Sequence, residues 1–215
     1  VGKRAYRSTC RDSTPQAAPA LDGPEAYRDF YAYEADTYAI SGETEEAWIH
    51  RRTLVRRLLP KGLSGRGLDA GCGDGALSRE LLGGTDLHAV TGMDLSIRRM
   101  LRAEQRDGLS FASGSTYALP FPDRSFDLVL CTDLLEHLDD PWRAMAELVR
   151  VSKRWVLISV PYRIDIEKTL CPHCGKDYFL YGHQHSFGKD GVTDLAEKAG
   201  ARVARFEHVI PMFEC

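Results

Sequence analysis

Glycine occupies every second position in one short segment of the chain. Residues 68–75 read Leu-Asp-Ala-Gly-Cys-Gly-Asp-Gly; an apolar segment leads into them and a helical pattern follows. Glycine permits positive φ and a close approach of the backbone to a ligand. The N–H groups at a helix start can hold a negative group, and ligands of open α/β sheets bind at the end of such a strand. The segment therefore predicts a binding site for a small ligand.

The spacing of these glycines differs from that of a dinucleotide site. The dinucleotide fingerprint is G-x-G-x-x-G, whereas here the third glycine comes one residue early and Ala76 stands in the last position. The Asp69 carboxylate would repel a pyrophosphate but would suit an amine or a sulfonium. Asp94 ends the next apolar segment, where a carboxylate can accept both hydroxyls of a ribose. The pattern favours a nucleoside that carries a cationic group.

At this point the chain resembles the class I S-adenosylmethionine (SAM) methyltransferases, in particular the subgroup with ubiquinone-type and natural-product enzymes that act on small molecules. The matching features are LDAGCGDG at 68–75, the acid Asp94, and LPFPDRSFDLVLCTDLLEHLDDP at 119–141. The resemblance covers roughly residues 30–210. It implies SAM as the cofactor, S-adenosylhomocysteine as its product, and a Rossmann-like α/β fold.

The resemblance further implies a mostly parallel seven-stranded sheet with helices on both faces and an N-terminal helical cap. Along the chain we expect six strands, at 67–70, 88–93, 109–112, 126–131, 154–160 and 201–209. Helices are expected in two pieces of the cap, the second at 43–59, and then at 76–82, 97–106, 140–148 and 188–199. The seventh strand is either absent or supplied by 170–182 or by the chain end. We divide the chain into a flexible arm at 1–22, a cap at 23–60 and a core at 61–215 with an insertion at 161–187.

The resemblance also suggests which residues contact the cofactor. Asp69, Gly71 and Gly73 would hold its amino-acid end, and Asp94 would bind the ribose. The family usually has an acid after the third strand; here Ser115 takes that place, and its hydroxyl can accept a bond from the adenine amino group without charge assistance. The other candidates are Thr116 and Leu95 beside the adenine, with an ordinary core role as the alternative for Leu95, and Thr132 at the end of the fourth strand.

The acceptor pocket is expected between the cap and the insertion. His185 and His137 are candidate general bases for a hydroxyl acceptor, with capping or structural roles as the alternatives. Arg163 and Lys189 could hold an anionic acceptor, or they could belong to a solvated loop. The cap contributes two further candidates for substrate binding, Tyr33 and Tyr38, for which packing is the alternative role.

A C-x-x-C motif lies within the predicted insertion, at Cys171 and Cys174. With His183 and His185 these cysteines could complete a tetrahedral zinc site. The histidines are two residues apart, however, and not three to five as in the usual zinc module. A metal-free turn with two reduced thiols is therefore favoured, with zinc and a redox pair as the alternatives.

Composition limits the remaining function classes. The 215 residues carry a net charge of -3 with a pI near 6.2, which argues against nucleic-acid binding through bulk electrostatics. The Pro-Pro-aromatic pattern of DNA amino-methylating enzymes is missing after the fourth strand. No apolar segment approaches the ~20 residues of a membrane helix, residues 1–20 resemble no signal peptide, and the cysteines are scattered. A cytoplasmic protein is expected.

These observations predict a SAM-dependent methyltransferase that acts on a small molecule, with a hydroxyl, carboxylate or phosphonate oxygen favoured as the acceptor. One alternative is an RNA methyltransferase that grips RNA through the C-x-x-C motif. The other is a regulatory protein that binds SAM or zinc without turnover. The sequence identifies neither the acceptor nor the oligomeric state.

Overall fold

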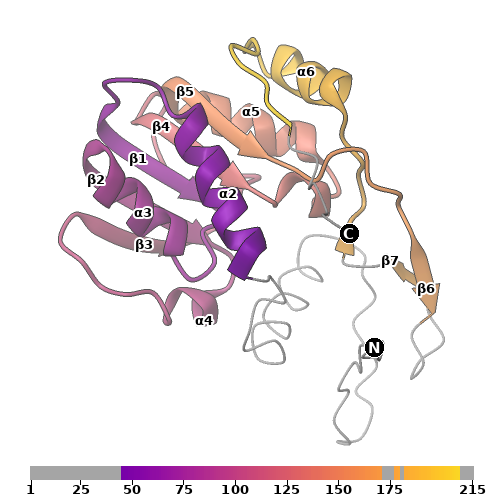
Figure 1. Cartoon of the computed structure of the whole chain (residues 1–215), viewed down its shortest axis with the longest axis horizontal. Coiled ribbons are helices and arrows are strands. Elements are labelled where there is room, and N and C mark those ends of the chain that lie inside the picture. Colours follow the sequence, from indigo (N-terminus) through magenta and orange to yellow (C-terminus); the bar gives the residue numbers. More distant parts are fainter. Residues whose placement is uncertain (1–44, 171–176, 180–181, 209–215) are drawn as a thin grey trace, which may run out of the picture.

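The computed structural model of the chain describes residues 45–170, 177–179 and 182–208 (Figure 1). The predicted arm at 1–22, the first cap helix, and the candidates Tyr33, Tyr38, Cys171 and Cys174 lie outside the described residues. None of the described helices is long and apolar enough to cross a membrane.

Five parallel strands form the central sheet, in the order β3-β2-β1-β4-β5 (Figure 1). Their bounds are Ser64–Ala70 (β1), Asp86–Asp94 (β2), Leu109–Ser113 (β3), Phe126–Thr132 (β4) and Ser152–Ser159 (β5). Strands β2 and β3 are added on one side of β1, and β4 and β5 on the other. The order therefore reverses next to β1, and ligands bind at the carboxyl edge of an open sheet at such a point.

Helices cover both faces of the sheet, as predicted, and give a three-layer α/β/α fold (Figure 1). Along β4, Leu128 and Leu130 pack with α2 and α3, whereas Val129 and Cys131 pack with α5 and α6. This alternation follows from the two-residue period of a strand. The helices span Glu45–Leu58 (α2), Ala76–Gly84 (α3), Ile97–Met100 (α4), Pro141–Val151 (α5) and Lys189–Lys198 (α6), with a 3₁₀ helix, η1, at Leu135–His137.

The predicted sixth strand is wrong for the described part of its range. Residues 201–208 form no strand, and most of their side chains are exposed. Ala201 N–H bonds back to Ala196 O at the end of α6, and the Arg205 side chain donates to Arg57 O at 2.8 Å. The apolar residues in this segment suggest a strand, but a strand also needs a backbone partner, and no described strand pairs with this segment. The described sheet has five strands.

The segment 170–182 does not supply a further strand of the sheet. Its described residues form one arm of an antiparallel hairpin of β6 (Lys168–Leu170) and β7 (Asp177–Phe179), which stands apart from the central sheet (Figure 1). Helix α4 is also shorter than predicted and ends at Met100. The bonds from Arg102 N to Arg99 O and from Ala103 N to Met100 O tighten its last turn into the 3₁₀ form, which ends the helix.

The LPFPD segment at 119–123 is shaped by one arginine of α5. Arg150 donates to Leu119 O at 3.0 Å and to Phe121 O at 2.9 Å, and it pairs with Asp123 and Glu147. Residues 119–123, which are part of the motif that carries the family resemblance, thus have a structural role in the connection before β4. This role is independent of the acceptor.

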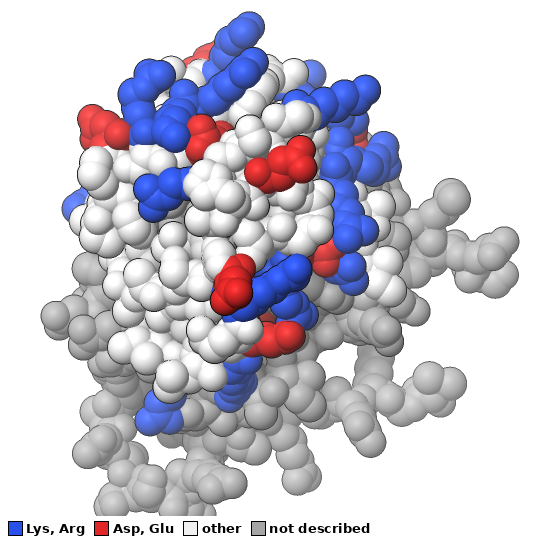
Figure 2. All heavy atoms as spheres, turned by 90° about the vertical axis from the view of Figure 1, so that its left-hand side faces the viewer, with Lys and Arg blue, Asp and Glu red and all other residues white. Residues whose placement is uncertain are grey.

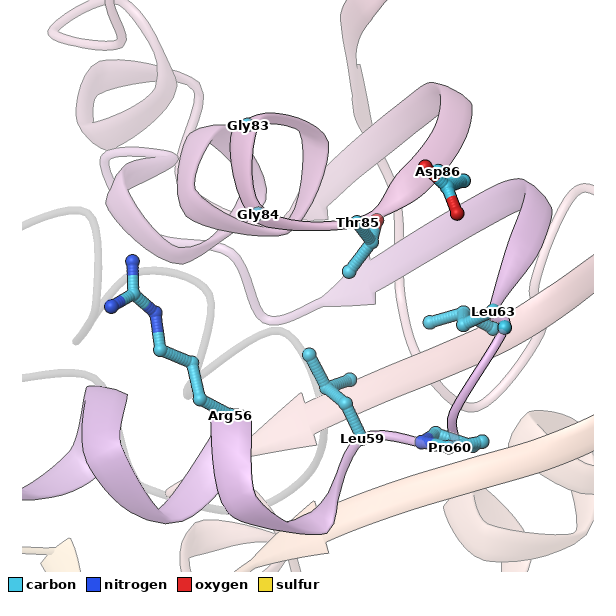
Figure 3. Close-up of a pocket in the computed structure, with 9 residues that line it drawn as sticks. Arg56, Leu59, Pro60, Leu63, Gly83, Gly84, Thr85 and Asp86 are labelled. Atoms are coloured by element: carbon cyan, nitrogen blue, oxygen red, sulfur yellow. The ribbon is translucent and has the colours of Figure 1, made fainter.

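A polar hollow of about 670 Å³ lies at the opposite, amino edge of the sheet (Figure 3). It is bounded by the end of α2, the end of α3 and the residues that lead into β1 and β2, such as Leu63 and Asp86. This hollow is therefore separate from the carboxyl edge, where the glycine turn lies.

Candidate cofactor site

The turn after β1 wraps against the end of β2. The N–H groups of Gly71 and Cys72 both donate to Met93 O, at 2.7 and 3.0 Å, and Gly75 N–H donates to Cys72 O at 2.9 Å. Gly71, Gly73 and Gly75 have φ values of 83°, 55° and 75°. Side chains other than glycine rarely adopt this left-handed region, so the alternating glycines set the path of the turn.

Two of these glycines differ in what surrounds them. A Cβ added at Gly75 would lie 2.5 Å from Cζ of Phe111 on β3, whereas a Cβ at Gly73 would meet no described atom within 4 Å. Gly75 is therefore required by packing inside the protein. Gly73 borders space that no described residue fills, and its missing side chain leaves that space to a ligand. This observation fits a cofactor that lies against the turn.

Asp94, the last residue of β2, fastens the turn. Its Oδ2 accepts from Gly73 N at 2.9 Å, and its Oδ1 accepts from Ser96 N at 2.8 Å. Each carboxylate oxygen has a second acceptor position. The half-buried Asp94 carboxylate can therefore hold the turn and accept ribose hydroxyls together.

Asp69 is a buried acid at the start of the turn, 1% exposed. Its Oδ2 accepts from Ser78 Oγ at 2.6 Å, and its Oδ1 has no hydrogen-bond partner among the described residues. Burial raises the pKa of Asp69 to about 6; the Ser78 bond opposes this rise, and the nearby Asp94 and Asp74 charges add to it. A buried oxygen without a donor fits the cationic amino group of SAM.

The raised pKa of Asp69 predicts a dependence of stability on pH. The folded protein binds more protons than the unfolded chain between its pKa of about 6 and the model-compound value of 3.8, so stability falls as pH rises through this window. Above pH 6 the buried carboxylate is charged. This lowers the free energy of unfolding by about 2 to 3 kcal/mol, since each pKa unit corresponds to about 1.36 kcal/mol. We expect Asp69→Asn to remove this cost.

Chemical denaturation of the wild type and of Asp69→Asn at several pH values measures the effect. The difference in unfolding free energy should move in favour of Asn by about 2 to 3 kcal/mol from pH 4 to pH 7. Asp86→Asn, at the exposed amino end of β2, is the matched control variant. A difference for Asp69→Asn that does not change with pH would contradict the assignment.

The predicted adenine-side residues lie after neighbouring strands. Gly114 N bonds to Asp94 O at 3.1 Å, which ties the end of β3 to the end of β2. Ser115 Oγ accepts from Tyr117 N at 3.2 Å, and Thr116 is buried. Leu95 follows β2 and Thr132 ends β4, and both are half-buried. The carboxyl edge thus collects these candidates, and their contacts with adenine remain proposals.

The predicted insertion is closed at its base. Tyr162 and Phe187 form a β-bridge, and Arg163 N donates to Phe187 O at 2.8 Å. The exposed Arg163 lies against Gly188, whose added Cβ would be 3.0 Å from Arg163 Nε, and Lys189 begins α6 with an exposed side chain. Arg163 and Lys189, the two predicted anion-binding residues, therefore lie on one surface, next to the bridge between Tyr162 and Phe187.

The two predicted histidines have different surroundings. The His185 ring packs edge-on against Trp142 and stacks on Phe187, at centroid distances of 5.8 and 5.9 Å. His137 Nδ1 lies 3.2 Å from Gly182 O, and burial is the main cause that lowers its pKa to about 4. A neutral imidazole with so low a pKa is a weak base at neutral pH, so His137 is the poorer of the two candidate bases.

Two acids after β4 were not among the predicted site residues. Asp133 (φ 47°) accepts from Ser159 Oγ at 2.8 Å and pairs with Arg51, which joins α2 to the carboxyl edge. Glu136 is 1% exposed, and burial, with the Asp133 charge next, raises its pKa to about 8. The signal was present in the sequence, because both acids lie in the short segment after the predicted fourth strand.

Comparison with known proteins finds similarity to methyltransferases. A family described as a methyltransferase domain matches residues 68–158. The 27-O-demethylrifamycin SV methyltransferase of Amycolatopsis mediterranei is 31% identical over 118 residues, which are 52% of this chain and 43% of that protein. A sterol 24-C-methyltransferase of Aspergillus fumigatus is 37% identical over 92 residues, or 40% of this chain and 24% of that protein. A solved phosphoethanolamine N-methyltransferase of Haemonchus contortus, in complex with SAM, superposes with a TM-score of 0.59 at 23% identity, over 84% of this chain and 43% of that one.

The family match and the curated relatives agree with the motifs, and residues 68–158 are a class I SAM-dependent methyltransferase domain. The solved structure agrees with the fold. The chain spans less than half the length of these two curated relatives.

Proposed function

We propose that this domain transfers the methyl group of SAM to a small-molecule acceptor, with an oxygen atom favoured. The observation that carries the proposal is the open space at Gly73 beside the Asp94 carboxylate, at the carboxyl edge next to β1. Bound SAM would supply a methyl group on a cationic sulfur, which is a good leaving group. The protein then needs mainly to align the acceptor with that methyl group.

The residues divide this work along the carboxyl edge. Asp94 would accept the ribose hydroxyls, and the buried Asp69 with the turn at Gly71 and Gly73 would hold the amino-acid end. Leu95, Ser115 and Thr116 would contact the adenine, and Thr132 would lie beneath the cofactor at the end of β4. Each role is consistent with the burial of these side chains, which ranges from half-buried to buried.

The acceptor side supports oxygen chemistry. His185 lies in the segment that leads from β7 to α6, and its backbone N–H donates to Glu136 O of η1. Its side chain could take a proton from a hydroxyl acceptor. Arg163 and Lys189 lie on one exposed surface and could pair with a carboxylate or phosphonate acceptor, which needs no base. The relatives carry names for oxygen and for carbon methylation, so this preference rests on these side chains.

A small acceptor is favoured over RNA on charge. The chain has a net charge of -3, and Figure 2 shows acidic side chains among the basic ones around a largely uncharged centre on one face. Nucleic-acid binding domains instead gather Lys and Arg into a patch or stripe.

Transfer of labelled methyl groups tests the proposal. Purified protein is incubated with methyl-labelled SAM and, separately, with a small-molecule metabolite extract or with total RNA. We expect label in the low-mass fraction, with a loss of about tenfold or more in Asp94→Ala and no loss in the control Asp86→Ala. Label that enters only RNA, or no transfer to either pool, would contradict the proposed function.

A further inference from the structure

Three side chains that can ligate a metal meet where the insertion returns to the sheet. Glu136 and His137 belong to η1, and His183 lies on the limb between β7 and α6. One potential ligand atom from each lies within 4.8 Å of the other two. Hydrogen bonds fix the limb on η1, since Gln184 N donates to Glu136 O at 2.7 Å and Gln184 Nε2 donates to His137 O at 2.6 Å.

Glu136 is the member whose surroundings are incomplete. Its side chain is 1% exposed, and neither carboxyl oxygen has a hydrogen-bond partner among the described residues. A buried carboxyl group without a partner is costly, and buried carboxylates are normally paired or bound to a metal. A cation between Glu136 and the two imidazoles would supply the missing partner.

His137 is oriented as a metal ligand is. Its Nδ1 lies 3.2 Å from Gly182 O; because a carbonyl oxygen only accepts, this bond requires the proton on Nδ1. Nε2 then carries the lone pair, and it faces Glu136 Oε1 at 3.9 Å. Metal-binding histidines are usually held in this way, with the second ring nitrogen donating to a carbonyl or carboxylate.

The separations suit a bound ion after small side-chain movements. Zinc–ligand bonds of about 2.1 Å place neighbouring tetrahedral ligands about 3.4 Å apart. The His183 ring is half-buried, and its centroid lies 4.8 Å from that of His137. The Gln184 bonds hold the limb on η1, so only the side chains of the three ligands need to move.

We propose that Glu136, His137 and His183 bind a divalent transition-metal ion. Two imidazoles and one carboxylate are a ligand set for such ions, and three protein ligands leave coordination positions open. The site differs from the zinc site that the sequence suggested, because it uses no cysteine. If the domain acts as proposed above, the ion lies just after Thr132 and could bind an acceptor oxygen; this role rests on the proposed function.

Titration of the chelator-treated chain with Mn²⁺ alone tests the site. Mn²⁺ is the probe because carboxylate ligands suit it, whereas thiolates select softer ions. We expect one bound ion per chain by electron paramagnetic resonance, with a rise in melting temperature. Glu136→Gln and His183→Ala should each weaken binding by about tenfold or more. His185→Ala, on the same limb, and the double variant Cys171→Ser/Cys174→Ser should bind as the wild type does.

Three outcomes would overturn the proposal. They are no Mn²⁺ binding by the wild type, unchanged binding by both Glu136→Gln and His183→Ala, and binding that is lost in the cysteine variant. Glu136→Gln keeps the side-chain volume, and His183→Ala changes a half-buried loop residue, so circular dichroism should show both folded without metal. The titration contains neither SAM nor acceptor, so its result is independent of the methyltransferase proposal.

Discussion

Asp94→Ala should weaken the binding of S-adenosylhomocysteine by about 3 kcal/mol, or roughly 100-fold. Hydrogen bonds to a charged acceptor contribute about 1.5–3 kcal/mol each, and the variant loses those to the two ribose hydroxyls. The variant also loses the hydrogen bonds that the N–H groups of Gly73 and Ser96 donate to the Asp94 carboxylate. Both losses act on the same site, because the turn that would hold the amino-acid end loses its attachment to β2.

Calorimetric titration with S-adenosylhomocysteine measures this loss. Asp86→Ala is the matched control, since Asp86 lies on the same strand at its exposed amino end. The control should bind with wild-type affinity. Equal affinity for Asp94→Ala and the wild type would mean that the ribose lies elsewhere.

Gly75→Ala should lower the free energy of unfolding by about 2 to 5 kcal/mol. A left-handed backbone costs a residue with a Cβ about 1–2 kcal/mol, and φ at Gly75 is 75°. The new Cβ would also lie 2.5 and 2.6 Å from two atoms of the Phe111 ring, and overpacking adds about 1–3 kcal/mol. The Phe111 ring is rigid and belongs to β3, so relief of the clash requires a shift of β3 in the sheet.

Two other glycines serve as controls for this prediction. Gly84 ends α3 with no atom near an added Cβ, so Gly84→Ala should be neutral or slightly stabilising. Gly73→Ala should cost only the backbone strain, about 1–2 kcal/mol, but should impair cofactor binding because its Cβ enters the open space. Chemical denaturation of the three variants gives the comparison. A loss at Gly75 no larger than that at Gly73 would contradict the packing argument.

The sequence predicted the parallel strands well, because each buried strand is a short apolar segment. It placed the start of the first strand too late, at Gly67. Strand β1 begins at Ser64, where the chain is polar and pairing with β2 sustains the strand. The sixth strand was predicted from its residue types and its place after the last helix, but residue types cannot supply a backbone partner.

For the site, too, local features could be predicted from the sequence and long-range contacts could not. The glycine turn and Asp94 could be predicted because the turn is local and the acid ends the neighbouring strand. Two other contacts had no local signal. His137 meets Gly182, 45 residues away, only because the insertion folds back on η1, and Arg51 pairs with Asp133 across 82 residues. Such contacts depend on the path of loops, which residue patterns do not determine.

A crystal structure of the protein with S-adenosylhomocysteine would test the central claim most directly. We expect the ribose hydroxyls on the Asp94 carboxylate, and the homocysteine end in the open space at Gly73, beside Asp69. A ligand bound in the hollow at the amino edge of the sheet, or at the carboxyl edge without contact to Asp94, would contradict the assignment.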